Sequence, residues 1–187
     1  MKLVVTEKND AAQKIADLLG VKKPKADKVY STPVYRFDVD GEEWVTIGLR
    51  GHILEPDFTP TMVYKKRGGW QGVTEEGETF PAQLPATLPK PPFKKKKPFT
   101  EDGVELKTWK MDALPYLVYA PIEKLPKEKE IIRSLKNLAK KADSIVIATD
   151  FDREGELIGA DALSCVRDVN ATAPVSRACY SAFTKEE

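Results

Sequence analysis

Cysteine and histidine are scarce in this sequence. Of its 187 residues, two are cysteines and one is a histidine. Cys165 and Cys179 stand apart and form no Cys-x-x-Cys pair, and His52 has no second histidine beside it. Zinc sites need three or four such ligands at short spacings, so the sequence argues against a structural zinc site. The cysteine content instead indicates a reduced, cytoplasmic protein.

Long apolar runs and an excess of one charge are also missing. The chain opens with Met1-Lys-Leu-Val-Val5, which is too short in apolar length for a signal peptide. No run approaches the ~20 apolar residues of a membrane span, so we expect no contact with a membrane. The 30 basic and 29 acidic residues leave a formal net charge of +1. No global positive field indicates nucleic acid, and any DNA contact must come from local patches.

What the sequence does contain is an apolar run followed at once by acids. The run Ser144-Ile-Val-Ile-Ala-Thr149 is rich in β-branched residues, which predicts a buried strand. Apolar residues then recur at helical spacing, which predicts a helix that begins near Arg153. The turn between them carries three carboxylates, on Asp150, Asp152 and Glu154.

Two explanations compete for this acidic turn. Three carboxylates so close together repel one another, which raises one or more of their pKa values unless a cation neutralises them. Mg²⁺ suits that task, because it accepts one or two carboxylates and fills its other positions with water or phosphate oxygens. Alternatively, Asp152 only caps the helix while Glu154 and Glu156 interact with its dipole. The position after a buried strand favours the metal, because ligands of open parallel sheets bind there.

The first residues of the chain repeat the order of strand, acidic turn and helix. Leu3-Val-Val-Thr6 predicts a short strand, and Glu7 and Lys8 follow it directly. Apolar residues over 12–19 then mark a helix face. Parallel strands place their carboxyl ends at one edge of a sheet, so we expect Glu7 to face the later acidic turn across a shared site. Taken alone, Glu7 is better explained as an ordinary exposed loop acid.

The middle of the chain predicts a hairpin and then less regular structure. Residues 29–39 and 44–49 alternate apolar and polar around Asp40-Gly41, which is a strong hairpin signal. His52 follows a glycine and either contacts phosphate or is a structural histidine. The further elements that we expect are strands at 116–120 and 174–182, a helix over 131–138 and a helix that starts at Thr184. A helix that starts so close to the last residue indicates a truncated chain.

Residues 56–98 differ in character from the rest of the chain. Eight of the fourteen prolines fall here, a density that disfavours helix and central strand. We therefore expect an extended, loop-rich insertion and not a separately folding domain. The basic runs Lys65–Arg67 and Lys94–Lys97 are interleaved with aromatic residues. They suit phosphate contacts and base stacking on nucleic acid, or equally a solvated tip that keeps the loop soluble.

The acidic turn with its flanks resembles a known family. The pattern Asp150-x-Asp152-x-Glu154-Gly, preceded far upstream by Glu7-Lys8, resembles the Toprim domain. The longer stretch Ala148-Thr-Asp-Phe-Asp-Arg-Glu-Gly-Glu-Leu-Ile-Gly159 is similar to type IA DNA topoisomerases, above all archaeal topoisomerase I and topoisomerase III.

The resemblance also covers Gly51-His52-Ile53 and residues 175–184, and it implies a fold. We expect an α/β, Rossmann-like Toprim domain, whose mostly parallel sheet is flanked by helices and carries a β-hairpin. It would occupy 1–187 as a single domain, with its core in 1–55 and 113–187 and a proline- and lysine-rich insertion at about 56–112. The rest of the enzyme would lie outside this chain.

The resemblance further implies a reaction and a cofactor. Type IA enzymes cut one DNA strand by tyrosine attack on phosphorus, pass the other strand through and reseal, which relaxes negative supercoils. Glu7 would protonate the leaving 3′-oxygen, and Lys8 would stabilise charge on the phosphoryl group. Asp150 and Asp152, with Glu154 as support, would hold Mg²⁺.

The expected partners are DNA, single-stranded or negatively supercoiled, and the remaining domains of the same enzyme. His52, Arg153 and Arg177 would contact phosphate, although a structural ion pair is the better expectation for at least one of the arginines. The nucleophilic tyrosine of the family lies in a later domain. We therefore expect this chain alone to bind Mg²⁺ weakly and to relax no plasmid.

Other functions share parts of this pattern. A Toprim nuclease or primase carries the same acids, but the flanks of the motif count against it. In phosphotransferases of the haloacid dehalogenase type, the nucleophilic aspartate follows an early strand, whereas Asp150 and Asp152 lie late in this chain. A nucleic-acid-binding module without catalysis is favoured only if the lysine-rich insertion dominates function.

Overall fold

A computed structural model describes residues 1–180 of the chain. It divides into two compact units, one formed by Met1–Leu54 with the chain from Pro126 onward, and the other by Glu55–Leu125. In the part of the chain that the structure describes, no helix is both long and apolar enough to cross a membrane. Both cysteines are free thiols, buried at Cys165 and exposed at Cys179.

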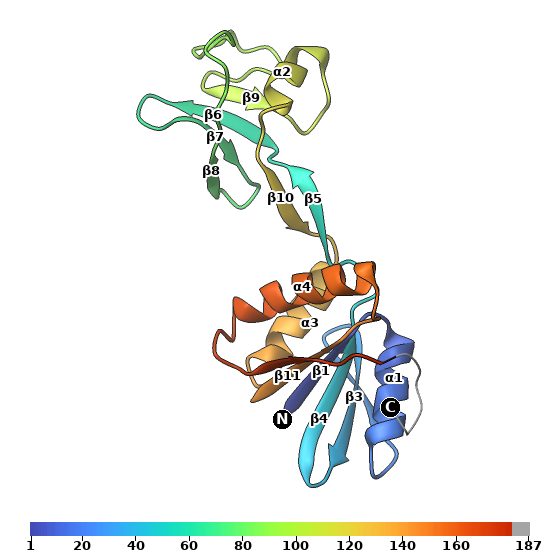
Figure 1. The fold of residues 1–187 in the computed structure, drawn as a ribbon. Coiled ribbons are helices and arrows are strands. Elements are labelled where there is room, and N and C mark those ends of the chain that lie inside the picture. The colour runs from blue at the N-terminus through green and yellow to red at the C-terminus, as the bar shows by residue number, and fades with distance from the viewer. Residues whose placement is uncertain (181–187) are drawn as a thin grey trace. The chain divides into compact units, whose positions relative to one another are not determined.

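A six-stranded sheet forms the centre of the first unit (Figure 1). In spatial order its strands are β12 (Val175–Arg177), β11 (Ser144–Ala148), β1 (Lys2–Thr6), β4 (Glu42–Gly48), β3 (Thr32–Val39) and β2 (Lys25–Val29). The first four strands run parallel, and β3 and β2 add two antiparallel pairings. The mostly parallel α/β sheet is confirmed, and so is the hairpin, whose turn residues Asp40 and Gly41 both have positive φ.

Three helices cover this sheet. Helix α1 (Asn9–Leu19) packs on one face, and helices α3 (Lys129–Ala139) and α4 (Arg153–Arg167) pack on the other (Figure 1). Alternation along the strands explains the two faces, because successive side chains point to opposite sides. Leu3 and Val5 belong to the core under α3 and α4, whereas the Thr46 hydroxyl donates to the Ala12 carbonyl of α1 at 2.9 Å. All three helices confirm the periodicity of the sequence.

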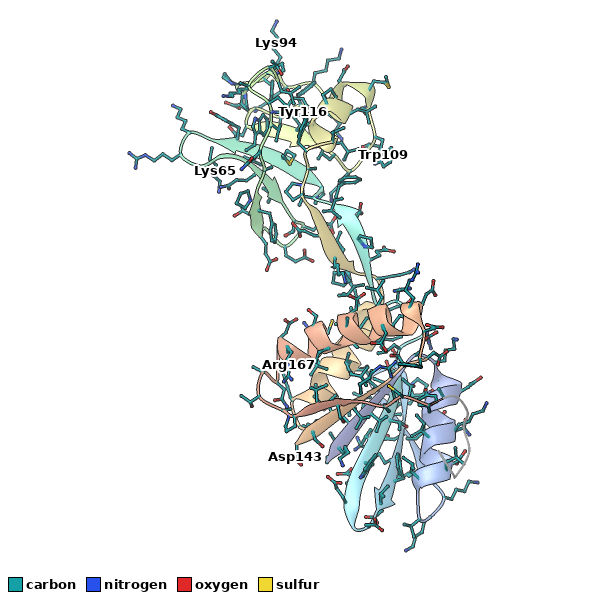
Figure 2. The ribbon with its side chains drawn as sticks, in the orientation of Figure 1. Lys65, Lys94, Trp109, Tyr116, Asp143 and Arg167 are labelled. Carbon is teal, nitrogen blue, oxygen red and sulfur yellow. The ribbon has the colours of Figure 1, made fainter. Side chains whose placement is uncertain are left out.

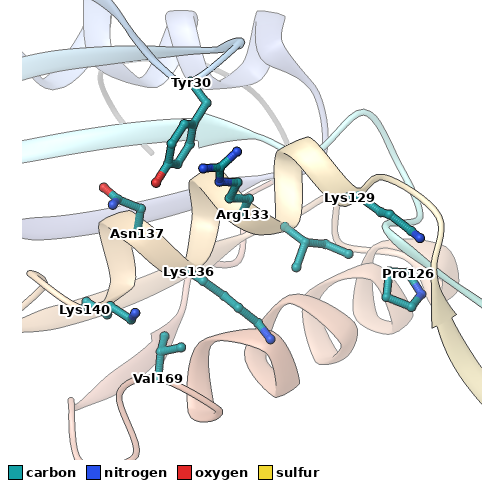
Figure 3. A pocket seen from close by; sticks show the side chains of 9 residues that line it. Tyr30, Pro126, Lys129, Arg133, Lys136, Asn137, Lys140 and Val169 are labelled. Atoms are coloured by element: carbon teal, nitrogen blue, oxygen red, sulfur yellow. The ribbon is translucent and has the colours of Figure 1, made fainter. Parts of the chain in front are cut away.

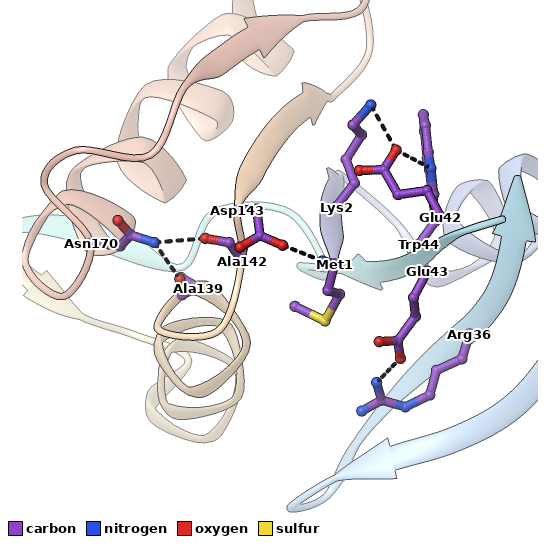
Figure 4. A network of polar contacts seen from close by, with 10 residues as sticks. All are labelled: Met1, Lys2, Arg36, Glu42, Glu43, Trp44, Ala139, Ala142, Asp143 and Asn170. Atoms are coloured by element: carbon purple, nitrogen blue, oxygen red, sulfur yellow. Dashed lines mark hydrogen bonds and ion pairs between the residues drawn. The ribbon is translucent and has the colours of Figure 1, made fainter. Parts of the chain in front are cut away.

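The amino ends of the strands are tied by polar contacts (Figure 4). The amino terminus of Met1 pairs with Asp143, which precedes β11. On the far side of that strand, the Asn170 side chain donates to the Ala139 and Ala142 carbonyls at 2.8 and 3.0 Å. Asn170 thereby bonds the carbonyl of the last residue of α3 and one carbonyl of the turn that follows the helix.

The second unit has strands of its own. Its four-stranded antiparallel sheet has the order β8 (Thr79–Pro81), β7 (Gly69–Val73), β6 (Thr61–Lys65) and β9 (Gly103–Glu105). The strands β5 (Leu54–Phe58) and β10 (Ile122–Pro126) pair with each other. The proline density predicted a loop-rich insertion, and the strands found here are three to five residues long. The unit spans Glu55–Leu125, against the expected 56–112. Whether it folds by itself stays a prediction.

Aromatic residues of the second unit pack against one another. Trp70 is 4% exposed, and its ring lies 5.5 Å from Tyr64, 6.4 Å from Phe93 and 5.4 Å from Tyr116, measured between centroids. Lys65 and Lys94 instead extend outward, while Tyr116 lies inside (Figure 2). The hypothesis that this aromatic set stacks on bases is therefore wrong for Trp70, because its ring forms the core of the unit.

Two expected elements differ from the structure. The predicted strand at 116–120 is wrong, because the chain forms a 3₁₀ turn, η1 (Met111–Ala113), and then helix α2 (Leu114–Leu117). A short apolar run does not distinguish strand from helix, and Pro115 is well tolerated in a first helical turn. The strand expected at 174–182 is β12, three residues long. The helix expected at Thr184 lies outside the described residues.

Candidate functional site

Strand register brings the two predicted acidic turns together. Thr6, the last residue of β1, pairs with Ala148 of β11 on one side and with Gly48 of β4 on the other. The three parallel strands therefore end level, and the residues that follow them share the carboxyl edge of the sheet. The backbone continues the alignment beyond the strands, since the Gly51 amide donates to the Glu7 carbonyl at 3.0 Å.

Lys8 lies between the two carboxylates expected at this edge. Its Nζ is 3.0 Å from Glu7 Oε1 and 3.6 Å from Asp150 Oδ2. The Glu7 side chain is 11% exposed, that of Asp150 41% and that of Lys8 64%. The hydrogen bond to Glu7 and the charges of Glu7 and Asp150 raise the pKa of Lys8 above its usual value. The structure thus brings Glu7, Lys8 and Asp150 to one point, as the two strand ends predict.

Asp152 has a different position from Asp150. It is the N-cap of α4, and its Oδ1 accepts a hydrogen bond from the Gly155 amide at 2.7 Å. Asp152, Arg153 and Glu154 are all exposed. Within residues 1–180, no three carboxylate, histidine or cysteine side chains gather closely enough to hold a metal. The structure therefore does not assemble Asp150, Asp152 and Glu154 into one cluster, and the capping alternative describes the side chain of Asp152.

Glycine permits the close approach of α4 to the acidic turn. A Cβ on Gly155 would lie 1.9 Å from the Asp150 carbonyl oxygen, which is a severe clash. The Thr149 hydroxyl also donates to the Gly155 carbonyl at 2.7 Å. The same device occurs across the site, where a Cβ on Gly48 would lie 2.5 Å from the Asn9 amide nitrogen. These glycines fix the backbone that presents Asp150 and Lys8.

Arg177 holds the acidic turn from the neighbouring strand. Its guanidinium donates to the Asp150 carbonyl at 3.0 Å, to the Ile147 carbonyl at 3.3 Å and to the Ala178 carbonyl. It also pairs with Glu156, with 2.7 Å between Nη2 and Oε1. Contacts with a carboxylate and three carbonyls occupy the donors of this side chain, which favours the structural ion pair over the phosphate contact for Arg177.

The other two predicted phosphate contacts lie on the same edge but are less constrained. Arg153 is exposed in the first turn of α4. His52 is half-buried and forms no hydrogen bond or ion pair with the rest of residues 1–180. It follows Arg50 and Gly51, both at positive φ, so the chain turns sharply where it leaves β4. Phosphate binding by Arg153 and His52 stays a prediction.

Sequence reasoning missed Tyr180 and the packing role of Gly48. The Tyr180 hydroxyl donates to the Ala148 carbonyl at 2.8 Å. Burial, followed by the negative charge of Asp150, raises the pKa of Tyr180, and the charge of Arg177 partly opposes this. Hydrophobic periodicity does not predict such contacts, because they join segments that are distant in the sequence. A glycine at the end of an apolar run was the one available signal for Gly48.

Comparison with known proteins agrees with this geometry. Residues 2–181 match the family model described as "Toprim domain". The chain is 34% identical to "DNA topoisomerase 1" of Archaeoglobus fulgidus, over 99% of this chain and 21% of that protein. It is 29% identical to "DNA topoisomerase 1" of Thermoplasma acidophilum, over 100% of this chain and 18% of that protein. A match to "DNA topoisomerase 3" of Caenorhabditis elegans is 35% identical over 43% of this chain and 11% of that protein.

The coverage is unequal in the two directions. The chain is matched over nearly its whole length, while it spans about a fifth of the length of these topoisomerase 1 relatives. The family model covers both strand–acid–helix units and the insertion between them. This chain therefore belongs to the Toprim domain family.

Proposed function

We propose that this chain is the Toprim part of a type IA DNA topoisomerase and supplies the acid, the lysine and the magnesium ligands for strand cleavage and religation. The observation that carries the proposal is the meeting of Glu7, Lys8 and Asp150 at the carboxyl edge of the sheet. Ligands of open parallel sheets bind at this edge. The reaction and the DNA substrate in this proposal are inferred from the relatives, which are named DNA topoisomerase 1.

Glu7 is suited to proton transfer at the scissile phosphate. In cleavage a tyrosine hydroxyl loses its proton to water and its oxygen forms a bond to phosphorus, the bond from phosphorus to the 3′-oxygen breaks, and Glu7 gives that oxygen a proton. On resealing, Glu7 takes the proton back as the 3′-oxygen attacks and the tyrosine leaves. Its side chain is largely buried and hydrogen-bonded to Lys8, so its position is fixed before substrate binds. Lys8 is more exposed and can stabilise charge on the phosphoryl oxygens.

The carboxylates of the edge fit a magnesium ion that takes most of its ligands from water and phosphate. Asp150 is partly exposed, and Asp152 uses one oxygen as a helix cap, which leaves the other available. Mg²⁺ typically takes one or two carboxylates in such sites, so a cluster of three is not needed. Asp150 and Asp152 would hold the ion, with Glu154 as outer support. When bound, it would supply positive charge that positions the cut strand.

The nucleophile and the DNA path belong to the longer protein in this proposal. The chain spans about a fifth of its topoisomerase 1 relatives, and the attacking tyrosine would come from the remaining domains. Single-stranded or negatively supercoiled DNA would be the substrate, and the place of action would be the cytoplasm. His52 and Arg153 would contact phosphate at the edge, and Arg177 would hold the Asp150 turn in place.

The test is Glu7→Gln in the longer protein that contains this chain. General acid catalysis contributes about 10²- to 10⁴-fold, so covalent protein–DNA complexes should form at least ~100-fold more slowly, while DNA binding and folding remain unchanged. Glu76→Gln, which removes an exposed carboxylate from the other unit, should retain full cleavage. Unchanged cleavage by Glu7→Gln would refute the proposed role. If the unchanged longer protein nicks DNA without forming a covalent protein–DNA complex, the protein is instead a Toprim nuclease.

A further inference from the structure

A basic groove lies along α3, outside the carboxylate site. Its volume is about 470 Å³, and it is lined mostly by α3, with Tyr30 from the β2–β3 turn, Pro126 at the end of β10 and Val169 just after α4. Four of the nine lining residues are cations and none is an acid. Figure 3 shows Tyr30, Arg133 and Asn137 close together, with Lys129 and Lys140 toward the two ends of the helix. The four cations are Lys129, Arg133, Lys136 and Lys140.

The cations follow the surface of a single helix face. Their spacing along α3 is four, three and four residues, which places them in one stripe. The opposite face is apolar and belongs to the core under the sheet, as Ile131, Leu135 and Leu138 show. Lys129 lies in the first helical turn, where a positive charge is unfavourable for the helix dipole. Helix stability therefore does not explain this lysine, whereas an anion in the groove would.

Most of this charge is left uncompensated by the protein. Lys136 pairs with Asp168 at 2.8 Å. Among residues 1–180, Lys129, Arg133 and Lys140 form no ion pair. Like charges on one helix face repel one another, so an anionic ligand would relieve this repulsion. The groove thus presents three cations that are free to meet such a ligand.

Arg133 is held in position by an aromatic ring. Its guanidinium carbon lies 4.0 Å from the centroid of the Tyr30 ring, within the range of a cation–π contact. The turn that carries Tyr30 is anchored on α3, because the Ser134 hydroxyl donates to the Val29 carbonyl at 2.8 Å. This contact uses the ring and none of the five N–H donors of the guanidinium, whose planar fork matches phosphate oxygens.

One end of the groove lies toward the sheet edge that carries Glu7, although no described residue of that edge lines it. Just before α3, the Glu128 amide donates to the Ile53 carbonyl at 3.2 Å. Two residues before Ile53, the Gly51 amide donates to the Glu7 carbonyl. Lys129 therefore lies near the carboxyl ends of the strands, and Lys140 lies near the amino end of β11. A strand bound in the groove would extend from that edge along the helix.

We propose that this groove binds the sugar–phosphate backbone of a nucleic-acid strand without reading its bases. The choice of nucleic acid over an acidic protein rests on the proposed function, together with the held guanidinium of Arg133. The site is separate from the Glu7 and Asp150 carboxylates. Binding here needs no divalent cation, so the two sites can be tested independently.

The experiment measures binding of a fluorescein-labelled 20-nucleotide single strand to the 187-residue chain in EDTA, by fluorescence anisotropy at several salt concentrations. The test variant is Lys129→Gln/Arg133→Gln/Lys140→Gln. We expect affinity at low salt to fall at least tenfold. The slope of log K against log salt should become shallower by about 2, since each lost phosphate contact on single strands removes ~0.7. Lys136 stays unchanged, because it pairs with Asp168.

The matched control removes the same charge elsewhere on the same unit. Lys22→Gln/Lys23→Gln/Lys25→Gln replaces three exposed lysines outside the groove and should change affinity less than threefold. Circular dichroism checks that both triple variants keep the fold. Equal losses in the two variants, or no binding by the unchanged chain, would overturn the proposal. So would polyglutamate of equal charge if it displaced the oligonucleotide as well as unlabelled DNA does, because the groove would then be a site for acidic peptides.

The same assay separates this proposal from the proposed function. Glu7→Gln should leave oligonucleotide affinity in EDTA within twofold of the unchanged chain. If Glu7→Gln loses cleavage but binds the oligonucleotide normally, and the groove variant loses binding, both proposals are supported. If Glu7→Gln retains cleavage while the groove variant loses oligonucleotide binding, the proposed role of Glu7 is refuted and the groove proposal is supported.

Discussion

Lys8 Nζ lies 3.6 Å from Asp150 Oδ2, although the two residues follow different strands from opposite parts of the chain. The contact exists because β1 and β11 are neighbours with their ends level. The same ammonium nitrogen lies 3.0 Å from Glu7 Oε1. One cation is therefore shared by two carboxylates that would otherwise repel each other, and any added cation competes with Lys8 for them.

We predict that Lys8→Gln strengthens Mg²⁺ binding by this chain, whereas Asp150→Asn weakens it. A unit charge ~4 Å from a ligand group contributes about 1 kcal/mol in water, so we expect about a fivefold tighter Kd for Lys8→Gln. Isothermal titration calorimetry at neutral pH and low salt measures both. Lys22→Gln, an exposed lysine elsewhere, is the control and should match the unchanged chain. Weaker binding by Lys8→Gln would show that the lysine supports the metal site instead of competing with it.

Gly155→Ala should destabilise the first unit strongly. The new Cβ would lie 1.9 Å from the Asp150 carbonyl oxygen, so either α4 or the acidic turn must move. We expect a loss of about 3 kcal/mol in the free energy of unfolding, the upper range for overpacking. Gly41→Ala is the control, because it has positive φ but nothing within 4 Å, and it should lose about 1 kcal/mol. Urea unfolding measures both, and equal losses would contradict the clash.

The two strand–acid–helix units were predictable because buried parallel strands leave a strong pattern. Strands β1 and β11 are apolar runs, and the acids that follow each run must share an edge once the strands are parallel. That reasoning located Glu7 and Asp150 together. It did not distinguish Asp150 from Asp152, because the hydrogen bond from the Gly155 amide to Asp152 depends on the exact residue at which α4 begins. Spacing alone does not tell a cap from a ligand.

Contacts between distant elements were not predictable. Arg177 binds carbonyls of β11 and the acidic turn because β12 pairs beside β11, and nothing in the sequence states that neighbour. The aromatic residues of the insertion were also ambiguous. The sequence does not tell whether an aromatic residue packs in a core or contacts a ligand. Only the fold shows that the rings of Trp70 and Tyr116 contact each other.

Tyr180 should titrate later than an ordinary tyrosine. Burial and the negative charge of Asp150 raise its pKa above the usual value near 10. A raised pKa in the folded state means that this stabilising contribution is complete below about pH 10 and is lost as pH rises through the folded value. In an absorbance titration at 295 nm, Tyr180→Phe should remove one late-titrating tyrosine.

Asp150→Asn tests the cause of this shift. It should move the pKa of Tyr180 back toward its usual value, because it removes a negative charge that raises it. Tyr116, whose pKa is raised by burial alone, is the internal reference and should not move. A titration curve that is identical before and after Asp150→Asn would mean that the charge of Asp150 does not contribute to the raised pKa of Tyr180.

Trp70→Ala should unfold the second unit, while Trp109→Ala should not. Trp70 is 4% exposed and contacts three aromatic rings, and removal of so large a buried side chain costs about 3–5 kcal/mol. Trp109 is 75% exposed, so its removal should change stability by less than about 0.5 kcal/mol. Limited proteolysis followed by mass spectrometry locates the damage. Trp70→Ala should be cut within 55–125 and Trp109→Ala should resist like the unchanged chain. If both variants resist equally, the Trp70 cluster does not hold the unit together, and short strands with proline-rich loops suffice for its fold.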